Sequence, residues 1–373
     1  MKVALVHDYL FEQGGAENVF QVMGQMFPLA PMYTLIYAPE TMSDAFRQHD
    51  IRTSFLQRLT TNKRKAKALL PLYPLAFHAM KLRGYDLVLT SSSSFAKGID
   101  VGDARHVCYC YTPPHFLWQT DRYIEQVTEP WKRTALRIAL GLLREQDLRD
   151  AANVDRFIAI SRLTQARIKR VYGRDATVIY PPVDASEFHL ADTIEPYLLV
   201  VSRLLPYKRV DIVIEACNRL GLPLVVVGDG PDRARLGALA GPTVTMRGRL
   251  PRREVVDHMA RCRALVFPGE EDFGLTPIEA NASGRPVIAY RAGGALETVI
   301  EGVTGAFFGA QTADALADVL AGFDASRYRP ADARAHALTF DRPRFKARLR
   351  SVLAMPMGTG ILVGVAVIVG ATV

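Results

Sequence analysis

Cysteine is scarce in this sequence, and its spacing excludes two structural roles. Only four of the 373 residues are cysteines, and a single pair, Cys108 and Cys110, is close in the chain. No second pair follows at a spacing that zinc sites use. We therefore expect reduced thiols in a reducing compartment, with neither a structural zinc nor a disulfide framework.

Low-complexity tracts and internal repeats at solenoid spacing are also missing. Met1 and Lys2 are followed at once by a strand-like run, so we expect no secretory signal. Apolar residues make up 49% of the chain and charged residues 23%, which supplies enough apolar material for two cores in 373 residues. These features favour an intracellular globular protein of two domains.

Acidic residues are nearly absent from the segment 47–83. It holds nine basic residues and the single acid Asp50, so it accounts for the whole net charge of +8. Aromatic residues and leucines are mixed with the basic ones. This mixture suits an anionic membrane surface or a polyanionic acceptor, and it suits equally a solvated basic face beside an ordinary core helix. No nucleic-acid-binding motif accompanies it, so we expect no nucleic acid partner.

Short apolar runs typical of buried parallel strands recur along the chain. In the first half they are Val3–His7, Tyr33–Ile36, Leu87–Thr90, His106–Cys110 and Phe157–Ile160, and in the second half Tyr197–Val201, Pro223–Val227, Thr243–Met246, Ala264–Phe267 and Val287–Tyr290. Helical stretches fit between them at 16–27, 132–150 and 162–172, and then at 209–220, 231–240, 252–262, 276–283 and 294–301. Strands that alternate with helices predict an α/β fold of two doubly wound, Rossmann-like domains.

Paired prolines mark the domain boundary, because Pro181-Pro182 can continue neither a helix nor a central strand. We expect domains at 1–184 and 185–354, with a last helix able to return to the first domain, and an apolar tail at 355–373. Doubly wound sheets bind ligands at the carboxyl ends of their strands. Two such sheets suggest a ligand held in a cleft between them.

The most informative segment directly follows the predicted strand Ala264–Phe267. It reads Glu270-Glu271-Asp272-Phe273-Gly274-Leu275-Thr276-Pro277-Ile278-Glu279. Thr276 is suited to cap a helix and Pro277 to begin it, so the free N–H groups of that helix would face the cleft and favour a phosphate. Thr276 and Glu279 also match a capping box, which explains Glu279 without a ligand. The capping box leaves the loop 271–274 unexplained, so the segment as a whole favours a binding function.

With Phe-Gly between Glu271 and Glu279, the sequence resembles the retaining glycosyltransferases of family 4, which have the two-domain GT-B fold. Further segments match the family in order: Gly14-Gly15-Ala16-Glu17, Ser202-Arg203-Leu204-Leu205-Pro206-Tyr207-Lys208-Arg209, Gly228-Asp229-Gly230-Pro231, and the runs 284–289 and 293–298. The resemblance covers roughly residues 1–350. It is closest to the mannosyltransferases of bacterial O-antigen and exopolysaccharide assembly (the WbaZ-like group). Each motif is weak alone, whereas five in order at sensible spacing are specific.

The resemblance implies a role for each matching position. Arg203 and Lys208 would bind the donor diphosphate, and fixed cations there would stabilise the charge of the leaving group. Glu271 would contact the donor sugar, without being assigned as a nucleophile, and Glu279 would hold the ribose hydroxyls. The predicted catalytic residues are Arg203, Lys208 and Glu271, and the remaining donor-binding residues are Gly14, Gly15, Phe273, Gly274, Leu275, Thr276 and Glu279.

The sequence departs from the family after the fourth strand of the first domain. Relatives often carry histidine in a Tyr-Cys-His-Thr-Pro run, and Tyr111 stands at that place here. A phenol donates a hydrogen bond but is not an equivalent proton carrier near neutral pH. Tyr111 and His115 are therefore the candidate acceptor-side residues. His115, like His106, also has a purely structural interpretation.

The resemblance implies retaining, metal-independent transfer of a hexose, with GDP-mannose as the nucleotide-sugar donor. The implied acceptor is a lipid-linked oligosaccharide or polysaccharide in cell-surface glycan biosynthesis, as in lipopolysaccharide or exopolysaccharide assembly. No cofactor is expected, and no metal, because Asp8 lacks the partner of an Asp-x-Asp pair. One alternative is a non-hydrolysing UDP-sugar 2-epimerase, which the paired glutamates and the Gly14-Gly15 loop disfavour. Another is an inactive partner protein that binds nucleotide sugar. The reason to consider it is Tyr111, which stands in place of the expected histidine.

An uncharged run of 22 residues, from Val352 to Val373, ends the sequence and follows several arginines. Its length allows a tail anchor, with the arginines on the cytoplasmic side. Its glycine and valine content disfavours an isolated helix, and a buried element or a tail foreign to the domain are the alternatives. We expect a cytoplasmic protein that is peripheral on the inner membrane, with this tail as a candidate anchor.

Overall fold

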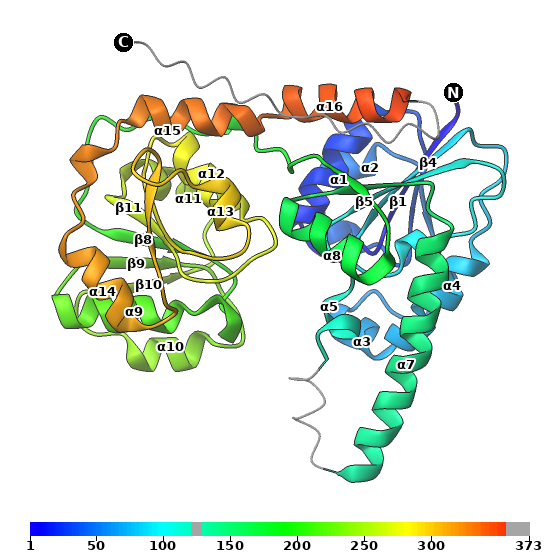
Figure 1. The fold of residues 1–373 in the computed structure, drawn as a ribbon, viewed down its shortest axis with the longest axis horizontal. Coiled ribbons are helices and arrows are strands. Elements are labelled where there is room, and N and C mark those ends of the chain that lie inside the picture. Colours follow the sequence, from blue (N-terminus) through cyan, green and yellow to red (C-terminus); the bar gives the residue numbers. More distant parts are fainter. Residues whose placement is uncertain (121–128, 356–373) are drawn as a thin grey trace.

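The computed structural model describes residues 1–120 and 129–355. These residues form two α/β units, each built on one parallel sheet with helices packed against it (Figure 1). The predicted fold class of two Rossmann-like units is confirmed. The order of the strands in each sheet decides where a ligand can bind.

The first sheet has seven parallel strands in the order β3-β2-β1-β4-β5-β6-β7. Its strands are β1 (Val3–His7), β2 (Met32–Thr34), β3 (Ile51–Thr53), β4 (Leu87–Ser92), β5 (Arg105–Cys110), β6 (Arg156–Ala159) and β7 (Ala176–Val178). Its helices are α1 (Gly15–Met26), α2 (Asp44–Arg47), α3 (Lys63–Ala68), α4 (Tyr73–Ala79), α5 (His115–Trp118), α7 (Pro130–Ala152) and α8 (Arg162–Tyr172). The chain changes direction between β1 and β4, so the loops that leave these strands diverge and open a crevice.

The second sheet has six parallel strands in the order β10-β9-β8-β11-β12-β13. Its strands are β8 (Leu198–Val201), β9 (Leu224–Val227), β10 (Val244–Gly248), β11 (Ala264–Phe267), β12 (Val287–Tyr290) and β13 (Gly305–Phe308). Its helices are α9 (Val210–Leu220), α10 (Arg233–Leu239), α11 (Arg252–Arg261), α12 (Leu275–Ala282), α13 (Ala295–Thr298), α14 (Ala313–Ala321) and α15 (Pro330–Ala337), followed by α16 (Arg342–Ala354). Here the change of direction falls between β8 and β11.

The buried strands are those that the apolar runs predict. β1, β11 and β12 have the predicted bounds, and the other predicted strands differ by one or two residues at one or both ends. The strands that were not predicted are β3, β7 and β13, all of them edge strands with partly exposed residues. An edge strand is covered less completely than a central one, so its sequence carries a weaker apolar signal.

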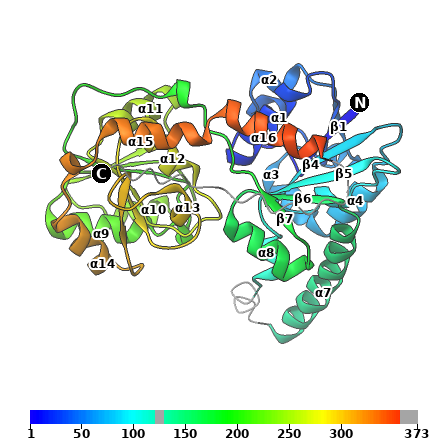
Figure 2. The same ribbon diagram turned by 45° about the horizontal axis from the view of Figure 1, so that its top comes forward.

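Helix α16 connects the second unit back to the first. Figures 1 and 2 show α15 and α16 following one another along one side of both units. Arg105 of β5 donates to the carbonyl oxygen of Leu353 at 2.7 Å, and Arg156 of β6 donates to that of Val352 at 2.8 Å. These bonds satisfy carbonyl groups that a helix leaves unpaired in its last turn. The chain thus crosses between the units a second time at its described end.

The basic segment 47–83 is not one helix. It contains β3, α3, α4 and three-residue to four-residue turns of 3₁₀ helix. On α3 the side chains of Arg64, Lys65 and Lys67 are exposed while Ala66 is buried. No helix within residues 1–120 and 129–355 is both long and apolar enough to cross a membrane. The structure describes no residue after Met355, so the predicted tail anchor lies outside the described residues from residue 356 onward.

Candidate functional site

The predicted catalytic residues lie where the second sheet changes direction. Arg203 and Lys208 follow β8, and Glu271 follows β11, its neighbour in the sheet. Because the carboxyl ends of neighbouring parallel strands meet at one edge, these distant positions come together. The ammonium nitrogen of Lys208 lies 2.5 Å from Glu271 Oε1. Lys208 and Glu271 are thus in contact, and the predicted roles of the three residues stay predictions.

Glycines allow the loops at this edge to pack closely. A Cβ on Gly228, whose φ is 136°, would lie 1.8 Å from the carbonyl oxygen of Ser202. A Cβ on Gly294 would lie 2.1 Å from the carbonyl oxygen of Phe273, and the Gly294 amide donates to the Glu271 carbonyl at 2.7 Å. Both glycine-rich segments thus hold the loops that carry the predicted donor residues.

Two helices, one from each unit, begin next to each other. α1 begins at Gly15 after β1, and α12 begins at Leu275 after β11. A Cβ on Gly15 would lie 3.0 Å from the Leu275 side chain, so the first residues of the two helices are in contact. The free N–H groups and dipoles of both helix ends favour an anion beside them. Gly14, Gly274 and Thr276 lie next to these two helix starts.

The predicted cap of α12 was wrong. The helix begins one residue before Thr276, and the preceding Gly274 has a φ of 89°, a left-handed conformation that glycine adopts at little cost. Pro277 is the third helical residue, Glu279 lies beyond the first turn, and no side chain caps this end in the described structure. The tight glycine turn starts the helix before the threonine is reached. Thr276 and Glu279 consequently form no capping box.

Glu279 is held instead by Arg252 of α11. The guanidinium of Arg252 lies 2.9 Å from Glu279 Oε1 and 3.1 Å from Glu187 Oε2. The contact orients the Glu279 carboxylate through one of its two oxygens. Sequence reasoning did not predict Arg252, because no pattern links α11 to α12 before the fold brings them together.

Arg203 projects from the second unit toward the first. Its side chain is 64% exposed, and it lies 3.7 Å from Oε1 of Glu12, in the loop between β1 and α1. Glu12 also forms an ion pair with Lys63 of α3. Burial disfavours the ionised carboxylate, but Lys63, Arg203 and Arg249 outweigh burial and lower the pKa of Glu12. Glu12 therefore pairs with one cation from each unit, Lys63 from the first and Arg203 from the second. The sequence analysis did not predict this role of Glu12.

The side chain of Phe273 packs in the core rather than in the cleft. It is 3% exposed, and its ring lies 5.4 Å from that of Tyr180 and 5.8 Å from that of Phe340, measured between centroids. Its predicted place among the donor-binding residues is thus not a side-chain contact. The ring fixes the loop that carries Glu271.

Tyr111 lies beneath the first turn of α1. Its hydroxyl is 2.9 Å from Ser91 Oγ and donates to the carbonyl oxygen of Ala16 at 2.9 Å, and burial raises its pKa well above the usual value. The structure favours a role in supporting α1 over the predicted contact with an acceptor. His106 is also buried, and burial lowers its pKa to about 4, so it stays neutral at physiological pH.

His115 takes part in a contact between the units. Its Nε2 lies 3.0 Å from Oδ2 of Asp272, which also forms an ion pair with Arg167 of α8. Burial opposes the charge on Asp272, but His115 and Arg167 outweigh it and lower the pKa. A second carboxylate, Glu297, accepts from the backbone amide of Arg162 at the start of α8 at 2.9 Å. Two carboxylates of the second unit therefore hold one helix of the first.

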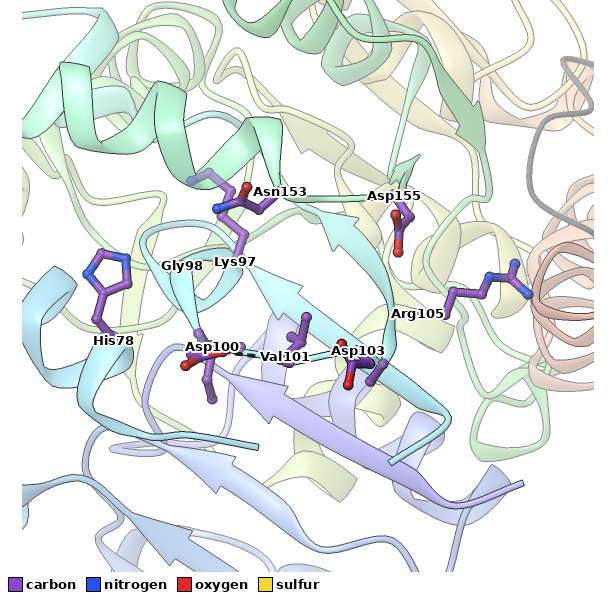
Figure 3. A pocket seen from close by; sticks show the side chains of 12 residues that line it. His78, Lys97, Gly98, Asp100, Val101, Asp103, Arg105, Asn153 and Asp155 are labelled. Carbon is purple, nitrogen blue, oxygen red and sulfur yellow. Dashed lines mark hydrogen bonds between the residues drawn. The ribbon is translucent and has the colours of Figure 1, made fainter. Parts of the chain in front are cut away.

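A cavity of about 770 Å³ lies at the other end of the first sheet, where β5 and β6 begin (Figure 3). Charged side chains of both signs line it, among them Lys97, Asp100, Asp103, Arg105 and Asp155. Doubly wound sheets bind ligands at the carboxyl ends of their strands, so this cavity lies on the wrong edge for the predicted donor.

A smaller cavity of about 260 Å³ lies in the first unit beside α8. Its lining residues are Pro113, Trp118, Gln119, Arg167, Arg170 and Val171. Arg167 also binds Asp272, so this cavity adjoins the loop that carries Glu271. An indole and two guanidinium groups are suited to a sugar that carries an anionic group.

Among the described residues, no three histidine, cysteine, aspartate or glutamate side chains gather so as to hold a metal ion. The absence of a metal requirement stays a prediction.

Two family models match this chain in succession. One, described as Glycosyltransferase Family 4, matches residues 13–187, and the other, described as Glycosyl transferases group 1, matches residues 184–334. Together they span both α/β units.

Curated relatives match over part of their lengths. A GDP-mannose-dependent alpha-mannosyltransferase of Mycolicibacterium smegmatis is 38% identical over 156 residues, which are 39% of this chain and 41% of that protein. A GDP-mannose-dependent alpha-(1-6)-phosphatidylinositol monomannoside mannosyltransferase of the same organism is 30% identical over 222 residues, with coverage of 50% and 54%. This chain thus spans about half the length of the curated relatives it matches.

Solved structures match over nearly the whole chain. Sucrose-phosphate synthase from Thermosynechococcus elongatus has a TM-score of 0.74 at 21% identity, covering 95% of this chain and 98% of that one. Anabaena HepE in complex with UDP-glucose has a TM-score of 0.70 at 19% identity, covering 95% and 99%. At these identities the likeness shows the fold alone.

Proposed function

We propose that this chain, which belongs to the family 4 glycosyltransferases, transfers mannose from GDP-mannose to a lipid-linked or polysaccharide acceptor with retention of configuration. The observation that carries the proposal is the meeting of two helix N-termini and two cations at the carboxyl edges of both sheets. A nucleoside diphosphate is a ligand whose negative charge suits that arrangement. Mannose as the sugar is supported by the mannosyltransferases among the relatives.

The groups at the site can stabilise departure of the diphosphate. When the bond between the sugar C1 and the phosphate oxygen breaks, negative charge develops on the phosphate, and Arg203 and Lys208 with the two helix ends stabilise it. The acceptor hydroxyl attacks C1 from the same face, and its proton passes to the departing phosphate oxygen. Glu271 is paired with Lys208, which suits a carboxylate that positions a sugar and a cation more than a nucleophile.

The acceptor side of the proposal rests on the small cavity beside the cleft. Trp118 offers an aromatic face for a sugar ring, and Arg167 and Arg170 offer charge for a phosphate. A sugar joined to a lipid through a diphosphate has both features. The basic segment 47–83 adds a surface for anionic lipid or for an anionic acceptor.

Direct calorimetry of donor binding tests the proposed function. We expect the purified chain to bind GDP-mannose at least tenfold more tightly than UDP-glucose or UDP-N-acetylglucosamine, because one base and one sugar must fit the crevice. Free GDP should bind as well, since the diphosphate supplies much of the interaction. Tighter binding of a UDP-sugar would redirect the donor assignment. A folded chain that binds none of these ligands would promote the inactive-partner alternative.

A substitution at Glu279 tests its predicted contact with the ribose. Glu279→Gln keeps the shape of the side chain but removes its charge, so we expect donor affinity to fall about tenfold, the cost of one charge-assisted hydrogen bond. Arg252→Met is the matched control, since it removes the partner of Glu279 without touching the ribose. An unchanged donor affinity in Glu279→Gln would contradict the predicted ribose contact.

A further inference from the structure

Helix α7 has one face in the core and, on another side, a row of exposed large apolar side chains. Its 23 residues extend away from the rest of the first unit, with the amino end farthest out, as Figures 1 and 2 both show. Leu136, Leu140 and Leu143 pack into the same core cluster as Ala66 of α3 and Leu117 of α5. The inner face of α7 thus holds it against the unit.

The outer face of α7 carries three large apolar side chains in a row. Trp131, Ile138 and Leu142 are 69%, 62% and 65% exposed. Their spacing of seven and four residues places all three within about 40° around the helix axis. Apolar residues scattered singly over a surface need no explanation, but an exposed stripe on one helix marks a surface that is covered in use.

Two cationic side chains are exposed on α7 near this stripe, Lys132 and Arg137. The ammonium group of Lys132 lies over the Trp131 ring and is paired with Glu129. The exposed bases of α3 belong to the same unit, and α3 shares a core cluster with α7. A helix with an apolar stripe and basic residues near it is the form that lies in the headgroup region of an anionic bilayer.

We propose that α7 docks this protein on an anionic lipid surface, with Trp131, Ile138 and Leu142 inserted among the lipid chains and the neighbouring bases on the headgroups. A second copy of the chain fits this face less well, since it would bring Lys132 and Arg137 against the same cations. The basic segment 47–83 of the same unit adds charge, and Leu59 and Leu75 within it are also exposed. The apolar stripe of α7 supplies insertion.

The link to the acceptor rests on the proposed function: the cavity lined by Trp118 belongs to the same unit as α7. α7 contacts α5, which begins at His115 and ends at Trp118. His115 binds Asp272 at the cleft, and Trp118 lines the acceptor cavity. A lipid-linked acceptor would therefore meet a unit that is already held at the bilayer surface.

Vesicle flotation tests the proposal on the full chain. We expect binding to vesicles of phosphatidylcholine with one third phosphatidylglycerol and little binding to phosphatidylcholine alone. The triple variant Trp131→Ser, Ile138→Ser and Leu142→Ser should bind at least tenfold more weakly, because three large apolar groups no longer leave water. The matched control replaces three exposed apolar residues elsewhere, Leu29, Ile194 and Leu338, and should bind as the wild type does.

Tryptophan fluorescence gives an independent readout, because Trp118 and Trp131 are the two tryptophans of the chain. In the Trp118→Phe variant the emission reports Trp131 alone, and anionic vesicles should shift it to the blue. Unchanged emission, or equal flotation of the triple variant and wild type, would overturn the proposal. So would loss of binding in a chain that ends at Met355, which would assign binding to the tail.

Two further measurements separate the remaining outcomes. If sedimentation shows a dimer that the triple variant abolishes, and wild type does not float, the stripe is an interface between copies and the proposal fails. Calorimetry with GDP-mannose on the triple variant checks that the fold and the donor site persist. Vesicle binding without nucleotide binding would leave this proposal standing while the proposed function fell.

Discussion

Replacement of Arg203 by alanine should lower turnover about a hundredfold or more while leaving the fold intact. A fixed cation that stabilises charge in the transition state contributes roughly this much when it is removed. The side chain of Arg203 is 64% exposed and meets Glu12 only at 3.7 Å, so little packing is lost with it. The effect should therefore appear in turnover and in donor affinity, with thermal unfolding nearly unchanged.

The measurement for Arg203 is steady-state turnover of GDP-mannose with thermal unfolding of the same preparation. Arg219→Ala is the matched control, because Arg219 is a similarly exposed arginine with a carboxylate partner, Asp314, and it lies at the far end of α9. Arg219→Ala should keep wild-type turnover. If Arg203→Ala keeps it too, Arg203 has no part in the reaction.

A methyl group at Gly294 should damage the site through packing alone. Gly294 has φ −66° and ψ −17°, which any residue adopts, so Gly294→Ala strains no dihedral angle. Its Cβ would nevertheless lie 2.1 Å from the carbonyl oxygen of Phe273. The loop that carries Glu271 must move to relieve this contact. We expect a loss of about 3 kcal/mol in the free energy of unfolding and a loss of donor binding.

Chemical denaturation and donor calorimetry measure the two effects of Gly294→Ala. Gly237→Ala is the control, because Gly237 lies within α10 and its Cβ would meet nothing within 4 Å. That change should stabilise the chain by about 0.5–1 kcal/mol, since alanine is the better helix former. A Gly294→Ala chain as stable as the wild type would show that the loop can shift freely.

The sequence by itself determined the central strands and the group of residues around Glu271. Buried parallel strands are apolar on both faces, so β1, β11 and β12 appear as continuous runs with sharp ends. Residues that follow neighbouring strands must meet at one edge, which places Lys208 beside Glu271 without knowledge of any distance. These inferences hold because they depend only on the local apolar pattern and on the small number of topologies that alternating strands and helices can adopt.

Only the tertiary structure decided the direction in which side chains point and the partners they find. Thr276 matched a capping box, yet the turn at Gly274 starts α12 one residue earlier, in a loop that packs against Gly294. Tyr111 stood at a pocket position in the sequence, yet its hydroxyl supports α1. The sequence did not reveal the exposed stripe on α7, because apolar residues have the same spacing along a helix whether they face a core or water. Whether a side chain is buried, which residue it contacts and what packs against a helix face all depend on groups distant in the chain. Local sequence does not specify them.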